Sequence, residues 1–436
     1  MCDYTMYAYL LGLRTCCYVL WQICRYYILG QPRVECITQL AMFLSKQNIL
    51  YAKLFQSLAS NASLLTVEEM NTLSRFNDNA PYSEEDIYPI EEWLDSFNKD
   101  TSSLSNCDLT IHSSVPDKSG VIAMVYYGTL DNKDIVIKVK RRNIEKKLKE
   151  GISNVEFAIH YLNWLPYLNN LNLKVIFQEN KQDLLRQVDF LHEIKTMETI
   201  RHKYRNTSYV CIPKAYPEYT VCNNQVIVMD KVSGHTLHDR DFSSNQDLKS
   251  RFGGLVAKYN MRSILYDRLY HADLHAGNIF FNDDDPNDLK ICIIDFGIIG
   301  EISKEYQDYF YLFFSNILME EKTLDAAKVC VDHFSSPKEI VKYLEANKKE
   351  ELLQELKTII NVIFETECQF DTNMIYTINK TLYKYGLRLN RNFCKIQISL
   401  AISSSVCNEL CKGTTKYMEY IKHATKELMD SFTNVE

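Results

Sequence analysis

The sequence predicts an α+β fold with two lobes, a small β-containing lobe and a mainly helical lobe, preceded by a helical extension. Three observations predict it. Apolar residues recur at helical spacing from Val34 to Asn77, residues 121–140 read as a β-hairpin, and helical periodicity dominates beyond Gly234. The expected segments are an apolar N-terminal segment at 1–35, the extension at 36–105, the small lobe at 106–232 with a helical insert at about 143–182, and the helical lobe at 233–436.

Each element follows from a local pattern. A polar, proline-containing stretch at Asn77–Glu85 interrupts the helices of the extension, a short helix is expected around Glu91–Phe97, and residues 98–107 have the composition of a linker. The hairpin turns at Asp131–Asp134, because the DNKD sequence consists of turn-forming residues. Further helices are expected at 143–182, at Asp183–Tyr204 and from near Lys304, and short strands at Tyr209–Ile212, Gln225–Met229, Ile279–Phe281 and Lys290–Ile294.

Composition is that of a soluble globular protein. The 436 residues allow two or three packed units at roughly 150 residues each. Hydrophobic residues make up 46% and charged residues 24%, which excludes bulk disorder, collagen and coiled coils. The formal net charge of -7 argues against a nucleic-acid partner, which would require a strongly basic balance.

The cysteines point to a reducing compartment. There are 14, but they are scattered, and the closest pairs, Cys16/Cys17 and Cys407/Cys411, lack CxxC spacing. A disulfide framework is not expected in so long a chain, and no spacing supports a zinc site. The compartment itself stays open between the cytoplasm and the mitochondrion.

Residues 4–29 are strongly apolar, and Trp21 with several tyrosines would suit a membrane interface. A spanning helix needs roughly 20 mostly apolar residues, but Arg14 and Arg25 leave only Thr15–Cys24 without a charge. No small-residue cleavage site follows the apolar run. Three interpretations remain open: a helix packed on the domain, an interfacial helix, or a targeting segment. We expect a protein that is soluble or in peripheral contact with a membrane.

The strongest chemical signal is HADLHAGNIFF followed by LKICIIDFGIIG. Asp273 and Asn278 are five residues apart in a loop that enters an apolar strand, and Asp295 follows four apolar residues. A single aspartate of this kind is more often a cap or half of a salt bridge. Together, carboxylate and amide oxygens suit Mg²⁺, which takes its remaining ligands from phosphates and water. The order HxDxxxxN then DFG is the protein-kinase-like arrangement, with HRD changed to HAD, and such a site has a spare carboxylate that can accept a hydroxyl proton.

A kinase-like site also needs a strand lysine that holds phosphates and a helix glutamate that orients it. In the IVIKV segment, strand alternation places Val136, Lys138 and Lys140 on one face. Glu193 lies on the predicted helix at Asp183–Tyr204. Each residue alone is more often a solvated surface charge, but the order of lysine, glutamate, HxDxxxxN and DFG indicates a kinase-like fold. We expect these side chains to meet in one cleft.

These motifs resemble the UbiB-type atypical kinase family, the ADCK kinases linked to coenzyme Q, from roughly residue 35 to residue 305. IVIKVKRRNI resembles the family's VAVKVQRPGI, QVDFLHE its ExDxxxE helix, HADLHAGN its HADPHPGN, and DFGIIGEIS its DFGMVGRLS. The segment Asn48–Ser83 resembles the KxGQ extension, which ordinary kinases lack. The resemblance implies ATP and Mg²⁺ as cofactors and an extension that covers the nucleotide site.

The resemblance also assigns residues. Lys53 and Gln56 take the lysine and glutamine of KxGQ, and the nucleotide loop corresponds to Lys118–Val125, with Gly120 and Val125 as nucleotide contacts. The resemblance also implies Lys138 and Glu193 as the ion pair, Asp273 as the catalytic aspartate, and Asn278 and Asp295 as the metal ligands. The chain departs from the family at Phe55, where KxGQ has glycine, and at Gln187, the first acid of ExD. Its nucleotide loop has also lost most of the family's alanines and has Gly120 instead. These departures leave the Lys–Glu–Asp–Asn–Asp set intact.

The expected substrate is small or lipid-like rather than a peptide. Ala272 replaces the arginine that pairs with activation-loop phosphate in HRD kinases, and no APE-like segment follows Gly297. Two alternatives stay open. One is a catalytically weak pseudokinase scaffold, and the other is a small-molecule kinase of the aminoglycoside or choline kinase type, whose HGDLHPGN loop is similar. The basic run Lys138–Lys149 is interpreted as a solvated helix face rather than a lipid-binding patch.

Overall fold

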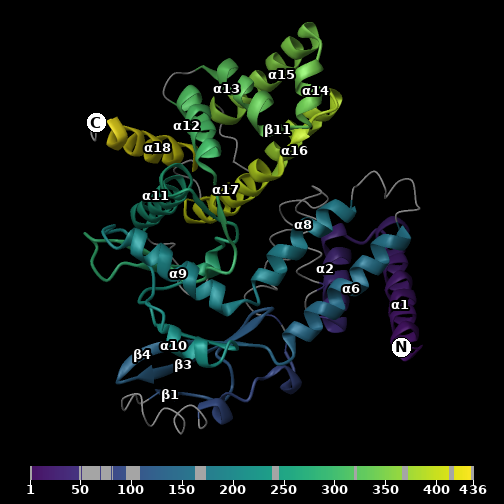
Figure 1. Cartoon of the computed structure of the whole chain (residues 1–436), viewed down its shortest axis with the longest axis vertical. Coiled ribbons are helices and arrows are strands. Elements are labelled where there is room, and N and C mark those ends of the chain that lie inside the picture. Colours follow the sequence, from purple (N-terminus) through teal and green to yellow (C-terminus); the bar gives the residue numbers. More distant parts are fainter. Residues whose placement is uncertain are drawn as a thin grey trace. The chain divides into compact units, whose positions relative to one another are not determined.

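The computed structural model is α+β and divides into two compact units (Figure 1). Unit 1 comprises Met1–Lys195 and Lys214–Lys231, and unit 2 comprises Thr196–Pro213 and Val232–Glu436. The predicted segment boundaries at 35, 105 and 232 stay predictions. The structure describes residues 2–48, 51, 69, 80, 82–94, 109–162, 173–237, 245–318, 322–365, 372–411 and 417–433.

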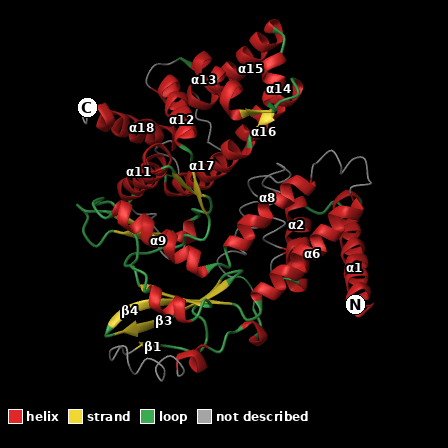
Figure 2. Cartoon of the chain, viewed as in Figure 1, coloured by secondary structure: helices red, strands yellow, loops and turns green. Residues whose placement is uncertain are grey.

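Unit 1 contains an antiparallel sheet with strand order β1-β3-β4-β6, in which β2 also pairs with β3 (Figure 2, strands yellow). The sequence patterns predicted β3, β4 and β6 but not the short strands β1 and β2. The strands are β1 (Leu109–Ile111), β2 (Lys118–Ser119), β3 (Ala123–Leu130), β4 (Lys133–Lys140) and β6 (Val226–Asp230).

The β3–β4 hairpin has a tight turn, in which Asp131 and Asn132 both have positive φ angles. Asn and Asp tolerate this left-handed conformation better than most residues, and two such residues in succession match the twist of a hairpin. The alternation predicted for β4 is confirmed. Ile135, Ile137 and Val139 are buried in the sheet core, while Lys138 lies on the opposite face.

The helices of unit 1 pack in two groups. α1 lies against α2, with the rings of Tyr18 and Phe43 stacked at 4.1 Å. α6 packs against α8 and buries Ile144, Leu148 and Phe177. The helices are α1 (Cys2–Tyr27), α2 (Arg33–Gln47), the 3₁₀ helix η1 (Glu84–Asp86), α6 (Ile144–Leu162), α8 (Leu173–Arg186) and α10 (Pro217–Cys222), and residues 90–94 are also helical.

The single helix expected at Asp183–Tyr204 is wrong, because α8 ends at Arg186 and α9 (Phe190–Tyr204) begins after a break. Asp189 causes the restart: its carboxylate accepts a hydrogen bond from the His192 N–H at 3.1 Å, which is an N-cap. The division between the two units falls within α9, after Lys195.

Unit 2 is mainly helical and contains small sheets, of which β11 and β12 form one. β8 pairs antiparallel with β9, β5 pairs parallel with β9, and β7 pairs antiparallel with β10. The strands are β5 (Val210–Cys211), β7 (Leu269–His271), β8 (Ile279–Asn282), β9 (Lys290–Ile293), β10 (Ile299–Glu301), β11 (Ser335–Ser336) and β12 (Arg388–Leu389).

An aromatic core joins distant helices of unit 2. The Phe310, Phe334 and Phe393 rings stack on one another, with centroid separations of 4.3–5.6 Å. The helices are α11 (Gln246–Arg262), η2 (Ser263–Asp267), η3 (Ala276–Asn278), α12 (Lys304–Leu318), α13 (Thr323–Val329), η4 (Cys330–Phe334), α14 (Lys338–Tyr343), α15 (Ala346–Glu365), α16 (Thr372–Lys384), α17 (Arg391–Leu410) and α18 (Tyr417–Thr433).

Among the described residues, every helix is too short or too polar to cross a bilayer.

Candidate functional site

The predicted lysine and glutamate form an ion pair in unit 1. Lys138 Nζ lies 2.7 Å from Glu193 Oε1, and the two side chains are 15% and 5% exposed. β4 positions the lysine, because its alternate residues are buried in the core. The first turn of α9 positions the glutamate, and the Glu193 N–H bonds to the Asp189 carbonyl at 3.0 Å. The lysine ammonium also lies 5.7 Å from the centre of the buried Phe190 ring.

The predicted nucleotide loop is the tight connection between β2 and β3. Val125 is paired with Lys138 across the β3–β4 ladder, so the two side chains share one face of the sheet. The Gly120 N–H donates to the Ala123 carbonyl at 2.8 Å and closes the turn. Val121 and Ile122, at its tip, are buried in the core that contains α6 and α8. The loop is therefore anchored by apolar contacts as well as by the sheet.

Unit 2 brings together the three predicted polar residues of the kinase-like motif. The Asn278 Nδ2 donates to the Asp273 carbonyl at 2.9 Å, which closes the loop between them. Ile279 is paired with Ile293, so Asn278 and Asp295 leave the same end of the β8–β9 ladder. The Asp295 carboxylate accepts a hydrogen bond from the Gly297 N–H at 2.9 Å.

His271 links the two aspartates and was missed as a site residue. Its Nε2 lies 2.6 Å from the Asp295 carbonyl oxygen, and its Nδ1 accepts the Asp273 N–H at 3.3 Å. Because Nδ1 accepts, Nε2 carries the proton and donates. Burial lowers the pKa of His271, which favours this neutral form. The signal was present in the sequence, since His271 opens the HAD motif.

The donor set in unit 2 suits a hard cation. The Asn278 amide is oriented by its hydrogen bond to the Asp273 carbonyl, so Oδ1 is the amide oxygen that would bind a cation. Asp295 supplies carboxylate oxygens at the same end of the ladder. Two oxygen ligands are few for a protein-only site, but Mg²⁺ characteristically completes its shell with phosphates and water.

Two further predicted site residues cannot be placed in either group, because they fall outside the part of the chain that the structure describes. Lys53 and Gln56, with Phe55, lie outside the described residues. The Lys–Glu pair belongs to unit 1 and the Asp–Asn–Asp group to unit 2, and each is described by itself.

The interpretation of Lys138–Lys149 as a solvated helix face is wrong for its first part. The Lys140 and Arg141 side chains are 0% exposed, because they belong to β4 and the turn after it rather than to a helix. Lys140 Nζ is paired with Glu145 at 3.0 Å and lies 5.1 Å from the Phe190 ring centre.

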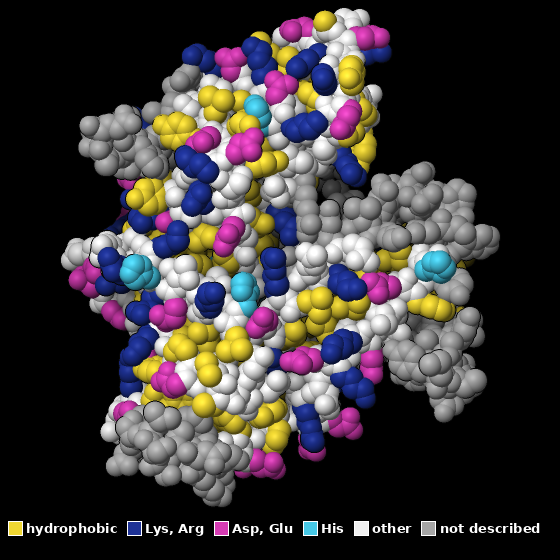
Figure 3. All heavy atoms as spheres, viewed as in Figure 1, with side chains coloured by type: hydrophobic (Ala, Val, Ile, Leu, Met, Phe, Trp, Pro, Cys, Tyr) yellow, Lys and Arg dark blue, Asp and Glu magenta, His cyan; other side chains and the backbone are white. Residues whose placement is uncertain are grey.

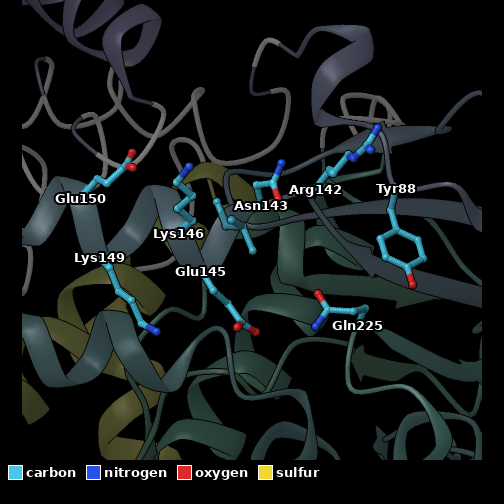
Figure 4. A pocket seen from close by; sticks show the side chains of 9 residues that line it. Tyr88, Arg142, Asn143, Glu145, Lys146, Lys149, Glu150 and Gln225 are labelled. Atoms are coloured by element: carbon cyan, nitrogen blue, oxygen red, sulfur yellow. The ribbon is translucent and has the colours of Figure 1, made fainter. Parts of the chain in front are cut away.

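A hollow of about 530 Å³ lies beside the start of α6 in unit 1. In Figure 4 the Glu145 carboxylate and the Lys149 ammonium point to one side of α6, and the Lys146 ammonium points to the other. Its lining residues are Tyr88, Arg142, Asn143, Ile144, Glu145, Lys146, Lys149, Glu150 and Gln225. None of these is a predicted site residue, so the hollow gives no support to a nucleotide site.

On the face drawn in Figure 3, cationic and anionic side chains are intermixed.

Comparison with known proteins identifies the family. The model of the ABC1 atypical kinase-like domain matches residues 111–333, which is about half of the chain. The chain belongs to the ABC1 atypical kinase-like family. The predicted resemblance to UbiB-type kinases is confirmed, and so is the kinase-like α+β fold.

Curated proteins described as probable protein kinases match about half of this chain. "Probable protein kinase UbiB" of Actinobacillus pleuropneumoniae serotype 7 is 27% identical over 231 residues, 50% of this chain and 39% of that protein. The Cronobacter sakazakii protein of the same description is 28% identical over 233 residues, 51% of this chain and 38% of that protein. The chain thus matches about two-fifths of the length of these relatives.

A solved structure, "The complex structure of Rv3197-erythromycin from Mycobacterium tuberculosis", has a similar fold. It aligns with a TM-score of 0.50 and 15% sequence identity, over 86% of this chain and 94% of that chain. At this identity the likeness concerns the fold alone.

Proposed function

We propose that this ABC1-family chain binds Mg-ATP and acts as an ATPase or phosphotransferase on a small or lipid-linked substrate. The observation that carries the proposal is the largely buried Lys138–Glu193 ion pair at 2.7 Å. Desolvation of two charges usually offsets most of the stability gained from such a pair. A lysine held in this way has a clear use as a ligand for nucleotide phosphates.

The proposed roles follow the chemistry of each group. Lys138 would bind phosphate oxygens, with Glu193 orienting its ammonium. Asp273 would accept the proton of the attacking hydroxyl or water. Asn278 and Asp295 would hold Mg²⁺, which neutralises charge on the phosphates. His271 would keep the backbone of both aspartates in register.

The segment after Asp295 supports a substrate that is not a peptide. Residues 296–303 alone separate Asp295 from α12, and they include β10, which pairs with β7. This short connection leaves little chain for a peptide-docking platform. Ala272, in place of an arginine, also gives activation-loop phosphate no guanidinium partner.

Mg-ATP binding to the full chain tests the proposal. Saturating Mg-ATP should raise the melting temperature, because a ligand at 100 Kd stabilises the folded state by roughly 2.7 kcal/mol. The shift should vanish in Lys138→Met and in Asp295→Asn. Asp288→Asn, which removes an exposed carboxylate paired with Lys290, is the matched control and should retain it. A wild-type protein that shows no shift would refute the proposal.

Turnover separates the enzyme from a pseudokinase scaffold, the alternative suggested by Phe55 and Gln187. If the chain is an enzyme, Mg-ATP hydrolysis falls at least about 100-fold in Asp273→Asn while Mg-ATP binding persists. Binding without any Asp273-dependent hydrolysis, with and without liposomes, would favour the scaffold.

We further propose peripheral contact with a membrane, in a reducing compartment. Apolar side chains are exposed around the end of α1, with Trp21 52%, Tyr27 78% and Ile28 76% exposed. Trp and Tyr favour the interfacial region of a bilayer. The wild type should therefore sediment with liposomes, and Trp21→Ser/Ile28→Ser should reduce the bound fraction several-fold. Val221→Ser, at another exposed apolar residue, should not, and equal sedimentation of all variants would contradict this contact.

A further inference from the structure

The Arg141 guanidinium is a buried hub in unit 1 that the proposed reaction does not use. Its side chain is 0% exposed. It follows β4 directly, three residues after Lys138, and its backbone N–H donates to the Ile122 carbonyl at 2.9 Å. Both its backbone and its side chain therefore contact the connection between β2 and β3.

The guanidinium donors reach two separate segments. On one side Nε donates to the Gly120 carbonyl at 2.9 Å, and Nη2 donates to Ser119 Oγ at 2.9 Å. On the other side Nη2 donates to the Ala80 carbonyl at 3.1 Å, and Nη1 to Asp86 Oδ2 at 3.2 Å. The Asp86 carboxylate supplies the opposite charge that a buried guanidinium requires.

Backbone hydrogen bonds join the same segments. The Ala80 N–H donates to the Ser119 carbonyl at 2.7 Å, and the Arg142 N–H donates to the Asp86 carbonyl at 2.8 Å. Ala80 is also buried in the same core cluster as Val121 and Ile122. Ala80 and Asp86 are thus tied to the Lys118–Val125 loop by hydrogen bonds, and Ala80 also by apolar packing.

Arginine suits this position better than lysine. A guanidinium has five N–H donors in a fixed planar fork, so it can serve two carbonyls, a hydroxyl and a carboxylate at once. A lysine ammonium has three donors at a single point and reaches fewer of these acceptors. The fork therefore fixes the spacing between Gly120 and Ala80 as well as neutralising Asp86.

We propose that Arg141 is a positioning residue that sets the Lys118–Val125 loop for nucleotide binding and ties it to Ala80 and Asp86. The inference rests on the proposed function for the identity of the ligand. The geometry gives the loop its importance, because Val125 lies opposite Lys138 in the β3–β4 ladder. A change in the conformation of the loop would therefore displace Val125 next to Lys138, the proposed phosphate-binding lysine. Arg141 would affect nucleotide binding in this way without contacting the nucleotide.

Hydrogen–deuterium exchange of the full chain, with Mg-ATP affinity measured on the same samples, tests this role. In Arg141→Met, amides of residues 119–123 should exchange about tenfold faster, and the Kd for Mg-ATP should rise about tenfold, because several charge-assisted hydrogen bonds are lost. Amides of the β3–β4 ladder at 126–130 serve as the internal reference and should keep their protection.

Two further variants give the test its controls. Lys147→Met removes a second cation from Asp86 but no contact to the loop, so it should leave both loop exchange and affinity within about twofold. Arg141→Lys keeps the charge but loses the fork, and should have an intermediate effect. It also replaces Arg141→Met in the comparison if that variant does not fold.

Three results would argue against the positioning role of Arg141. Unchanged loop exchange in the Arg141 variants, equal effects of Arg141→Met and Lys147→Met, or faster exchange throughout unit 1 would each overturn the positioning role. Arg141-dependent loop exchange in a protein that binds no Mg-ATP would instead refute the proposed function and leave the positioning of the loop standing.

Discussion

Gly300 illustrates how a single residue constrains the packing around the DFG motif of unit 2. It pairs with Tyr270 in the β7–β10 ladder, and a Cβ built at Gly300 would lie 1.9 Å from Cζ of that tyrosine. Only glycine lets the ring lie across the backbone here. The Gly300 of the DFGIIG motif is therefore required by close packing, next to the strand that carries His271.

We expect Gly300→Ala to lower the free energy of unfolding by about 1–3 kcal/mol, because the Tyr270 ring must leave its position. Gly254→Ala is the matched control. Gly254 lies within α11, and its Cβ would make ordinary contacts of 3.4 Å with the Tyr420 ring. That variant should be stabilised by about 0.5–1 kcal/mol, as expected for glycine in a helix. Urea denaturation measures both, and a stabilised Gly300→Ala would contradict the packing argument.

At the scale of elements, Asp86 connects η1 to the start of α6. Burial raises the pKa of Asp86, but hydrogen bonds from Lys147 and the Ser83 N–H, with the charges of Lys147 and Arg141, lower it more strongly, so the pKa lies below its ordinary value. The folded state therefore stabilises the ionised form of the Asp86 carboxylate relative to the unfolded chain. Its contribution to stability is fully present above the unfolded-chain pKa of about 3.9 and is lost as the pH falls through the lower folded-state pKa.

We expect Asp86→Asn to lower the free energy of unfolding by about 1–3 kcal/mol at pH 7, because Arg141 and Lys147 lose their counter-charge. The gap between variant and wild type should narrow as the pH falls below about 4. Urea denaturation from pH 7 to pH 3 checks this. A gap that stays constant with pH would show that the ionised carboxylate is not the source of the stability.

Local sequence patterns were sufficient to predict some of the helices and strands but not others. The β3–β4 hairpin was predicted because alternation and turn residues agree, and both are local. The restart of α9 at Asp189 was missed, because helical periodicity continues across the break and only the cap marks it. The short strands β1 and β2 have little pattern of their own and are defined by pairing with β3.

At the scale of the whole molecule, the sequence motifs predicted which residues lie together inside each unit: Lys138 with Glu193 in unit 1, and Asp273 with Asn278 and Asp295 in unit 2. Lys138 and Glu193 are 55 residues apart in the sequence. Strand alternation placed the lysine, a predicted helix carried the glutamate, and the kinase-like order of motifs predicted that the two would pair. Arg141 was misassigned because composition alone cannot separate a buried cation from a solvated one. Its burial depends on the carbonyl of Ala80 and the carboxylate of Asp86, about 60 positions away, which no periodicity encodes.

The hydroxyl of Ser399 affects where the chain can be truncated for experiments. It donates to the carbonyl of His271 at 2.8 Å, although the two residues are 128 positions apart. Ser399 belongs to α17, well past the end of the matched family region at residue 333. A fragment that ends at residue 333 would lack this hydrogen bond to His271, so a test of the proposed activity needs a chain that extends through α17.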